Sequence, residues 1–545
     1  MAANRVSLGR RHFMKTGMAA LMATAAGSVR GASGDAERKK AVRRPRRVIF
    51  NNDGNDAFVT DAPATREGFL SVRMDHFAGC GVDSVFYCTT MSSVFTHDSK
   101  VLQVLTARAG NLKNNRTGAL LSMGTDPLRL AIETCRKHDT EVFWSLRMND
   151  IHDNWFGQLR AQWKQKHPEL VMGSPADAAR YDIRDPRQIW TLADYQRREV
   201  RELMVRAVAE VLEKYDVDGI ELDFLRHVCY FKETRLYQPV MPAHRDLLTD
   251  LVRQVREAVL AASRRKGKPV LLSARVLQTM ALNQRFGLDL AQWVGRGYLD
   301  FVTVGGGFDP FTSPGKELVD WCHARDVPAY GCITREGLRQ GGWSGPPIPH
   351  SELSEMSKES WLGAAANTWA LGVDGIMTFN LFPSLPGTPE TTLAREVWRE
   401  IGQPKNLAGK DKLFCIEHLH DDDYCWMIRS VSREGRLPVS VSKGATVTRV
   451  LPVADDIPGL ANRMRKLRLR LYLDHFQEPD KVSVRINGVK LAAMPEQPQW
   501  LGADVPPHVM RRGPNELAIT FERGSSASWA LTVRSVELRV QYAGA

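Results

Sequence analysis

The distribution of hydrophobic and polar positions divides the chain into two parts that meet a little after residue 400. In the first part, short apolar runs alternate with longer segments in which apolar residues recur every three or four positions. This alternation is typical of strands followed by helices. Eight strands are predicted, at residues 47–51, 82–88, 141–146, within 215–227, 269–276, 299–304, 328–334 and 373–380.

The second, fourth, sixth and eighth of these strands begin alike. Each starts with an apolar residue and an aspartate, at Val82-Asp83, Val217-Asp218, Leu299-Asp300 and Val373-Asp374. A recurring connection into the strand indicates repeated βα units, and eight units predict an α/β fold of the (β/α)8 TIM-barrel type over residues 47–402. The alternative is a doubly wound open sheet, which usually has a Gly-rich first loop that is absent here.

The second part of the chain has a different period. After a linker at 402–412, residues 413–545 contain short runs in which apolar and polar residues alternate, separated by turn signals such as Asn487-Gly488. This pattern predicts an all-β sandwich, which we interpret as an accessory or carbohydrate-binding-like domain.

The positive charge of the chain is concentrated at its N-terminus. Residues 1–47 contain twelve Lys or Arg and two acidic residues, whereas the remainder has 62 basic and 60 acidic residues. A nearly neutral folded part removes the main support for nucleic-acid binding. Arg10-Arg11-His12-Phe13, followed by an Ala-rich segment, resembles a twin-arginine export signal. We therefore expect a signal peptide at 1–30, a basic flexible segment at 31–46, export to the periplasm or beyond, and no membrane span.

Eight cysteines in an exported chain permit disulfides without requiring them. Cys415 and Cys425 flank a polar turn, so a hairpin would place them opposite each other, and we expect the other six to be buried free thiols. No Cys or His cluster has the spacing of a zinc site, and no cofactor is expected.

The fourth predicted strand carries two carboxylates on one face. Ile220, Leu222 and Phe224 fall on one side of this strand, and Glu221 and Asp223 fall on the other. Carboxylates on an otherwise hydrophobic strand need a polar, enclosed place, and the mouth of a barrel provides one.

Other polar residues occur where strands end, at the face of a barrel where function collects. The candidates for substrate binding are Asp53, Arg147, Asn149, Asp150, Arg226, His227, Arg275 and Asn380, with Trp155 from the insertion 151–186, which could wall a cleft. Carboxylates outnumber every other catalytic type, and no Ser-His-Asp set or phosphate-binding loop is present.

A surplus of carboxylates favours hydrolysis of glycosidic bonds, in which one carboxyl protonates the leaving oxygen and another attacks the anomeric carbon or activates water. Parity places Arg147 and Arg275 beside the fourth strand, and their charge favours an ionised carboxylate. Asp223 is therefore predicted to be the nucleophile or base, and Glu221 has even odds between catalysis and a structural ion pair. The proton donor is predicted to be Glu336 or Asp309.

Arg147, Arg226 and Arg275 admit two interpretations of equal weight. They either recognise carboxylate or sulfate groups of an anionic sugar, or they form ion pairs with the acidic strand. Two other functions stay open: a carbohydrate-binding barrel without catalysis, and a metal-dependent hydrolase that uses Asp53 and Asp150.

Residues 217–227, with residues 194–200 before them, resemble bacterial glycosyl-hydrolase-like TIM-barrel proteins of the family ten-like group. The resemblance covers about residues 46–400 and implies a barrel acting on a poly- or oligosaccharide. The strand is also similar to the chitinase-type motif Asp-x-x-Asp-x-Asp-x-Glu, with Asp218, Glu221 and Asp223 in register. Leu225 stands where that family has its catalytic Glu, so a strand-four Asp nucleophile, as in several α-glycosidase families, is the better match for Asp223.

Overall fold

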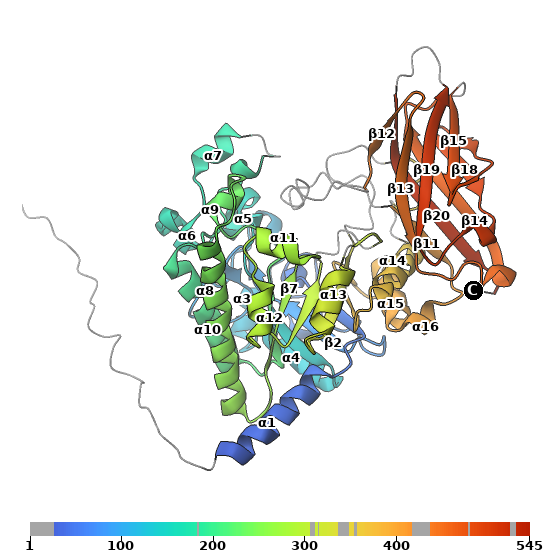
Figure 1. The fold of residues 1–545 in the computed structure, drawn as a ribbon. Helices are drawn as coiled ribbons and strands as arrows, with labels where there is room; N and C mark the ends of the chain where they lie inside the picture. Colours follow the sequence, from blue (N-terminus) through green and yellow to red (C-terminus); the bar gives the residue numbers. More distant parts are fainter. Residues whose placement is uncertain are drawn as a thin grey trace, which may run out of the picture.

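The first domain is a closed barrel of eight parallel strands, as predicted (Figure 1). The computed structural model describes residues 27–181, 185–305, 311–313, 315–335, 348–353, 357–416, 436–477, 480–523 and 530–544. Every residue of the barrel strands is buried. In order around the barrel they are β1 (Val48–Asn52), β10 (Ile376–Phe379), β9 (Ala329–Thr334), β8 (Phe301–Val304), β7 (Leu271–Val276), β6 (Gly219–Asp223), β5 (Glu141–Arg147) and β2 (Ser84–Cys88).

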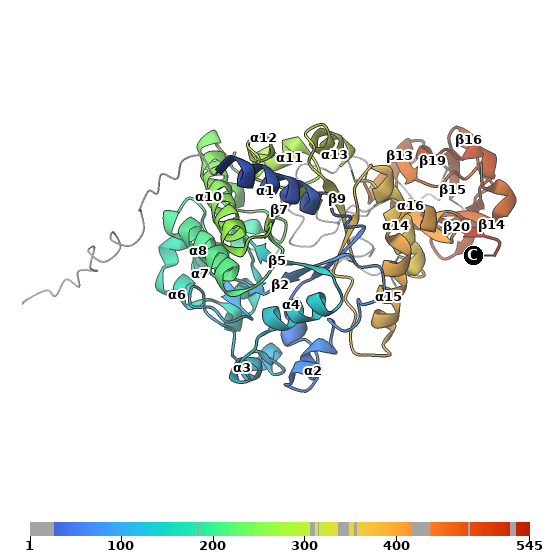
Figure 2. The same ribbon diagram turned by 90° about the horizontal axis from the view of Figure 1, so that it is seen from below.

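Helices connect the strands and cover the outside of the barrel (Figures 1 and 2). Sequence signals fix several of their ends: Asp126 caps one helix by accepting from the Arg129 N–H at 2.9 Å, with Pro127 in its first turn. The helices around the barrel are α2 (Arg66–Leu70), α3 (Thr117–Ser122), α4 (Pro127–Lys137), α5 (His152–Trp155), α6 (Gln162–Lys166), α7 (Pro175–Arg180), α8 (Arg198–Lys214), α9 (Lys232–Arg235), α10 (Pro242–Lys266), α11 (Met280–Arg285), α12 (Leu290–Gly295), α13 (Lys316–His323), α14 (Lys358–Ala370), α15 (Pro389–Ile401) and α16 (Pro404–Leu407).

The basic segment 31–46 is mostly helical, where the sequence predicted a flexible segment. It belongs to α1 (Gly27–Val42), which lies below the barrel, at the end where the strands begin (Figures 1 and 2). Arg38 of this helix pairs with Asp300 at 2.5 Å. Arg46 is fully buried and binds both oxygens of Glu141, at 2.6 and 2.7 Å, with its guanidinium 4.7 Å from the Phe301 ring. The helix is therefore fixed to the barrel by Arg38, and the segment that follows it is fixed by Arg46.

The second domain is a two-layered antiparallel β structure, in agreement with the predicted sandwich. A two-residue turn joins β15 (Lys481–Ile486) to β16 (Val489–Lys490), as the sequence indicated. Both residues of the turn, Asn487 and Gly488, have a positive φ. One sheet contains β11 (Lys412–Cys415), β20 (Ala530–Tyr542), β14 (Met464–Asp474), β18 (Trp500–Asp504), β17 (Met494–Gln497) and β12 (Val439–Ser442). The other contains β13 (Thr446–Val453), β19 (Gly513–Arg523), β15 (Lys481–Ile486) and β16 (Val489–Lys490).

Helices α14 to α16 lie between the barrel and the sandwich (Figure 1). Gly363 of α14 approaches β11 so closely that a Cβ there would lie 2.1 Å from the Leu413 carbonyl oxygen. Asn367 of the same helix donates to the Phe311 and Pro452 carbonyls, each at 3.0 Å, and accepts from the Ala454 N–H at 2.9 Å. The two domains thus share one packed junction.

Six cysteines in the described part of the chain are buried free thiols, as expected: Cys80, Cys88, Cys135, Cys229, Cys322 and Cys332. The pairing predicted for Cys425 lies outside the described residues, as do the export signal, Asp309 and Glu336. Among the described helices, none has the length and apolar character needed to cross a membrane.

Candidate functional site

The predicted site residues gather where the barrel strands end. Register places Arg147 of β5, Asp223 of β6 and Arg275 of β7 side by side on three adjacent strands. Side chains alternate along a strand, so all three point into the lumen at one level, with Ser145, Glu221 and Ser273 one level deeper. This arrangement was predicted from parity alone.

Asp223 and Arg275 form a closed pair. The Arg275 Nε and a terminal nitrogen donate to the two carboxylate oxygens at 2.9 and 2.7 Å, and the Leu225 N–H donates to the first of these at 2.9 Å. Both side chains are 3% exposed or less. The Phe379 ring lies 4.2 Å from the same guanidinium. Asp223, the predicted nucleophile, is thus held by Arg275 in a buried ion pair.

Glu221 lies beneath this pair and is fully buried. Its Oε2 accepts from the Ser145 hydroxyl at 2.6 Å, while its Oε1 has no hydrogen-bond partner in the structure. Burial, together with the negative charge of Asp223, raises the pKa of the Glu221 carboxyl to about 7, although Arg275 opposes the change. Glu221 does not line the cleft described below, and its raised pKa is compatible with a structural carboxyl as well as with a proton donor.

Arg147 lies between two other carboxylates. It binds Asp53 Oδ1, and it donates to Asp150 Oδ2 at 2.6 Å. Burial raises the pKa of Asp53, but the charges of Arg147 and Arg226 outweigh burial and lower it below its ordinary value. For Asp150, burial is likewise outweighed, by His152 and Arg147, and its pKa falls well below the usual range. Both carboxylates are therefore ionised at neutral pH.

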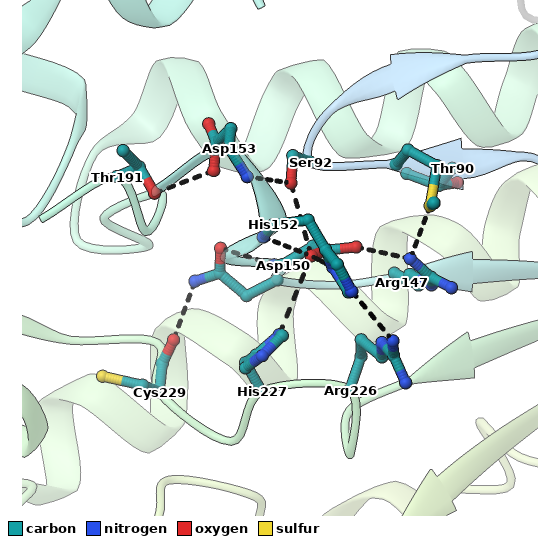
Figure 3. A network of polar contacts seen from close by, with 12 residues as sticks. Thr90, Ser92, Arg147, Asp150, His152, Asp153, Thr191, Arg226, His227 and Cys229 are labelled. Carbon is teal, nitrogen blue, oxygen red and sulfur yellow. Dashed lines mark hydrogen bonds and ion pairs between the residues drawn. The ribbon is translucent and has the colours of Figure 1, made fainter. Parts of the chain in front are cut away.

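His152 joins this cluster to Arg226 (Figure 3). Its Nδ1 contacts Asp150 Oδ1, and its Nε2 lies 3.1 Å from a terminal nitrogen of Arg226. The His227 Nδ1 lies 3.9 Å from the same Asp150 oxygen. Burial lowers the pKa of His227 well below its ordinary value, so this ring is neutral.

A cleft of about 560 Å³ opens above these residues. The cluster contributes Asp53, His152 and Arg226 to its lining, and the loop after β1 and the insertions after β2 and β5 contribute amide and aromatic side chains. The insertion 151–186 therefore walls a cleft, as the sequence suggested. The amide and aromatic residues are Asn55, Asn111, Asn114, Gln158, Phe58 and Phe156.

Several predicted binding residues do not line this cleft. Asn149 is 3% exposed, and its amide donates to the Ala193 and Cys229 carbonyls at 3.0 and 2.7 Å, so it braces two loops. Trp155 packs edge-on against His152, with ring centroids 6.5 Å apart. Asn380, which adopts a left-handed φ of 59°, lines a separate hollow of about 310 Å³.

The carboxylates do not form a metal centre within the described part of the chain. No group of three His, Cys, Asp or Glu side chains is arranged there to hold an ion. Asp53 and Asp150, the predicted metal ligands, face each other across the Arg147 guanidinium, which occupies the place between them. A cation in that place repels a second one.

Sequence reasoning overlooked His152 and Phe156 as site residues. His152 follows Asp150 by two positions, a spacing that lets its ring turn back onto the carboxylate, and this was the available signal. Phe156 is 38% exposed, and nothing in its sequence context separates it from a packing residue.

No protein-family model matches the chain, and no curated protein sequence does either. Solved structures similar to it include α-L-fucosidase isoenzyme 2 from Paenibacillus thiaminolyticus, with a TM-score of 0.42 and 14% identity over 68% of this chain and 51% of that one. A GH36 α-galactosidase from Geobacillus stearothermophilus has a TM-score of 0.36 and 10% identity over 92% of this chain and 56% of that one. A glycoside hydrolase family 18 N-acetylglucosaminidase from Paenibacillus barengoltzii has a TM-score of 0.35 and 14% identity over 66% of this chain and all of that one.

The chain thus spans about half the length of the fucosidase and of the galactosidase. At these identities and TM-scores the likeness carries no information about the substrate or mechanism of this chain. The resemblance to the family ten-like group stays a prediction.

Proposed function

We propose that this protein is a glycoside hydrolase that cleaves a poly- or oligosaccharide in the cleft at the barrel mouth. The observation that carries the proposal is an ionised carboxylate, Asp53, in a cleft whose lining includes several amide and aromatic side chains. Amides bind sugar hydroxyls, aromatic faces stack on sugar rings, and a carboxylate stabilises the positive charge that develops at the anomeric carbon.

Asp53 and Asp223 are the two candidates for the carboxylate that faces the anomeric carbon. Asp53 lines the cleft, whereas Asp223 lies deeper with both oxygens on Arg275. We therefore favour Asp53 over Asp223, and we keep Asp309 and Glu336 as the predicted proton donors. A Asp53→Asn variant is expected to lose activity by a factor on the order of 10³, whereas Asp223→Asn should act mainly through stability.

The activity is tested by incubating the protein with an array of neutral and anionic glycans and measuring new reducing ends. Hydrolysis by the native protein and its loss in Asp53→Asn support the proposal. Hydrolysis that survives in Asp53→Asn but disappears in folded Asp223→Asn would return the role to Asp223.

We further propose that the sugar is anionic. Arg147 and Arg275 already form ion pairs with buried carboxylates, which favours the ion-pair interpretation for these two arginines. Arg226 and Lys113 both line the cleft, where a sugar carboxylate or sulfate could reach them. Arg226→Gln is expected to raise KM for anionic glycans and to leave KM for neutral ones unchanged. Equal KM changes for both would contradict this assignment.

A carbohydrate-binding protein without catalysis is the second candidate. It is favoured by one observation: within the described residues, the carboxylates nearest the cleft, Asp53 and Asp150, have lowered pKa values and cannot serve as acids at neutral pH. Binding of a glycan measured by calorimetry, with no cleavage of any glycan in the array, would establish this alternative.

We also propose export through the twin-arginine route. Its support is the sequence Arg10-Arg11-His12-Phe13 and the Ala-rich segment after it. Replacing both arginines by lysine is expected to retain the protein in the cytoplasm, as measured by cell fractionation.

A further inference from the structure

A hollow distinct from the cleft lies at the same end of the barrel. Its volume is about 640 Å³, and its lining comes from the loop after β6, the start of α10, and the segment around α11, which follows β7. Both α9 and α11 lie at the end of the barrel where α5 lies, opposite α1 (Figure 1). The volume falls within the usual range for ligand pockets, about 300 to 1,000 Å³.

One loop lines both the cleft and this hollow. Arg226, near the start of the loop between β6 and α10, lines the cleft. Thr234 and residues 237–240, towards the end of the same loop, line the hollow. The two cavities therefore share one loop on one face of the barrel, where the two ends of a long ligand can be bound separately.

Buried contacts hold the walls of the hollow in place. Phe286 of the lining is only 4% exposed, and Arg235, which is 5% exposed, donates to Asp177 at 3.1 Å. The Phe231 ring stacks on His244, with ring centroids 4.7 Å apart, and this contact ties the loop to the start of α10. A preformed cavity of this kind lowers the entropic cost of binding a ligand.

The lining of the hollow is basic. Arg245 of α10 and Arg285 of α11 belong to it, and none of the described residues that line it is acidic. Neither guanidinium forms an ion pair or a hydrogen bond with a residue in the described part of the chain. Arg147 differs, because it already binds Asp53 and Asp150. An arginine whose donors are unused can bind a carboxylate or a sulfate through two parallel hydrogen bonds.

The other polar side chains of the lining fit a sugar. Gln238 and Gln284 are exposed, and their amides can donate to hydroxyls and accept from them. Tyr237, which is 57% exposed, adds an aromatic ring to the same lining. It has a positive φ of 59° just after the end of α9, where glycine or asparagine is usual and a bulky residue is rare. The turn itself therefore does not account for a tyrosine there.

We infer that this hollow is a second binding site for an anionic polysaccharide, in which Arg245 and Arg285 bind the carboxylate or sulfate groups of the sugar. The inference rests on the proposed anionic substrate and extends it to a site outside the cleft. No bond of the sugar is made or broken in the hollow. Its effect is to retain long chains, so it lowers KM for a polymer and leaves the hydrolytic step unchanged.

The first test measures binding and does not depend on activity. Calorimetry uses oligogalacturonate and dextran sulfate as anionic probes, with neutral dextran for comparison. The double variant Arg245→Gln/Arg285→Gln is matched by Arg206→Gln/Arg264→Gln, which removes the same charge at two exposed arginines outside the hollow. Arg226→Gln measures the contribution of the cleft.

We expect the native protein to bind at least one anionic probe, with an affinity that the matched control keeps within about threefold. The hollow variant should bind that probe about tenfold or more weakly, because two charge-assisted contacts are lost. A preference for oligogalacturonate would identify a uronate polymer, and a preference for dextran sulfate a sulfated one. Equal affinities of the hollow variant and the control, equal binding of neutral dextran, or binding of neither anionic probe would overturn the inference.

The second test measures kinetics on a glycan that the native protein cleaves. Arg245→Gln/Arg285→Gln is expected to raise KM for the polymer about fivefold or more, with kcat unchanged, and to leave KM for the shortest cleaved fragment unchanged. A lower kcat with an unchanged KM would contradict a role in binding alone. If the hollow variant loses binding but the native protein cleaves no glycan, the proposed hydrolysis fails while the second binding site stands.

Discussion

At the scale of single residues, the barrel mouth is organised by arginines that each satisfy buried carboxylates. Arg275 holds Asp223, and Arg147 holds both Asp53 and Asp150. A buried charge without a partner is expensive, so such pairs fix one arrangement of side chains. These pairs keep most of the carboxylates away from the cleft, whereas Asp53 lines it while it is paired with Arg147.

The Asp223–Arg275 pair makes a prediction about stability. Arg275→Met leaves a buried carboxylate without its cation, and we expect a loss of about 3 to 5 kcal/mol in the free energy of unfolding. The double variant Asp223→Asn/Arg275→Met should recover part of that loss. Urea unfolding measures both, with Arg198→Met, whose side chain is 80% exposed, as a control expected to change by less than about 0.5 kcal/mol. A double variant no more stable than Arg275→Met would contradict the pairing argument.

Glu221 makes a prediction about pH. Its folded-state pKa of about 7 lies above the unfolded value of 4.5, so the folded protein binds an extra proton between these two values. The stability that this proton provides is fully present below the unfolded pKa and is lost as pH rises through the folded pKa, by on the order of 3 kcal/mol. Glu221→Gln should therefore flatten the stability profile between pH 4.5 and 7. An unchanged slope in urea unfolding across this range would refute the assignment.

At the scale of elements, four strand-start aspartates connect neighbouring strands. Each side chain accepts an N–H at the start of the strand before its own. Asp83 accepts from Arg47 at 2.8 Å, Asp218 from Val142 at 2.9 Å, Asp300 from Leu272 at 2.7 Å and Asp374 from Ala329 at 2.8 Å. The repeated Val-Asp or Leu-Asp signature is thus a clamp that joins each of these strands to the strand before it in the chain.

These clamps should differ in strength. Asp300 has a side chain 4% exposed and also binds Arg38 and Arg256. Asp300→Ala leaves both arginines without this carboxylate and should lower the free energy of unfolding by about 3 kcal/mol. Asp374 is 41% exposed and pairs with His323, so Asp374→Ala should cost about 1 kcal/mol. Chemical denaturation of the two variants checks the order. Equal losses would show that burial does not control the strength of the clamp.

At the scale of the whole molecule, the barrel and the sandwich are joined through a shared core. One hydrophobic cluster includes Trp361 of α14, Phe414 of β11 and Leu451 of β13. Lys412, fully buried, pairs with Asp455 at 2.9 Å across the same region. Because this packing is continuous and apolar, we expect the two domains to unfold together.

Asn367 is the polar link in this junction, and it carries the prediction at this scale. Asn367→Ala removes the bonds to Pro452 and Ala454 on the sandwich side and the bond to Phe311 on the barrel side. We expect calorimetry to show one thermal transition for the native protein and a lower or divided transition for the variant. An unchanged single transition would mean that apolar packing alone couples the domains.

Much of this fold could be predicted from the sequence, because the barrel and the sandwich are both specified by local patterns. Eight apolar runs, the repeated aspartate and the change to a two-residue period predicted the strands, their order along the chain and the two kinds of architecture. Parity along β6 also placed Arg147, Glu221, Asp223 and Arg275 in one lumen, since the side-chain period of a strand is fixed. The helix α1 was the exception, because it and the residues after it are held by contacts of Arg38 with Asp300 and of Arg46 with Glu141, which lie far away in the sequence.

Only the tertiary structure decided which of these polar groups are available for chemistry. Sequence proximity could not show that Arg275 pairs with Asp223 or that the Asn149 amide donates to two loop carbonyls. It also could not show that the His152 ring lies between Asp150 and Arg226. Pairing and exposure depend on side chains that converge from different strands and insertions, and their energies are set by burial and by distances of a few ångströms. Local pattern therefore determines where the mouth of the barrel is, and packing determines which residues there can act.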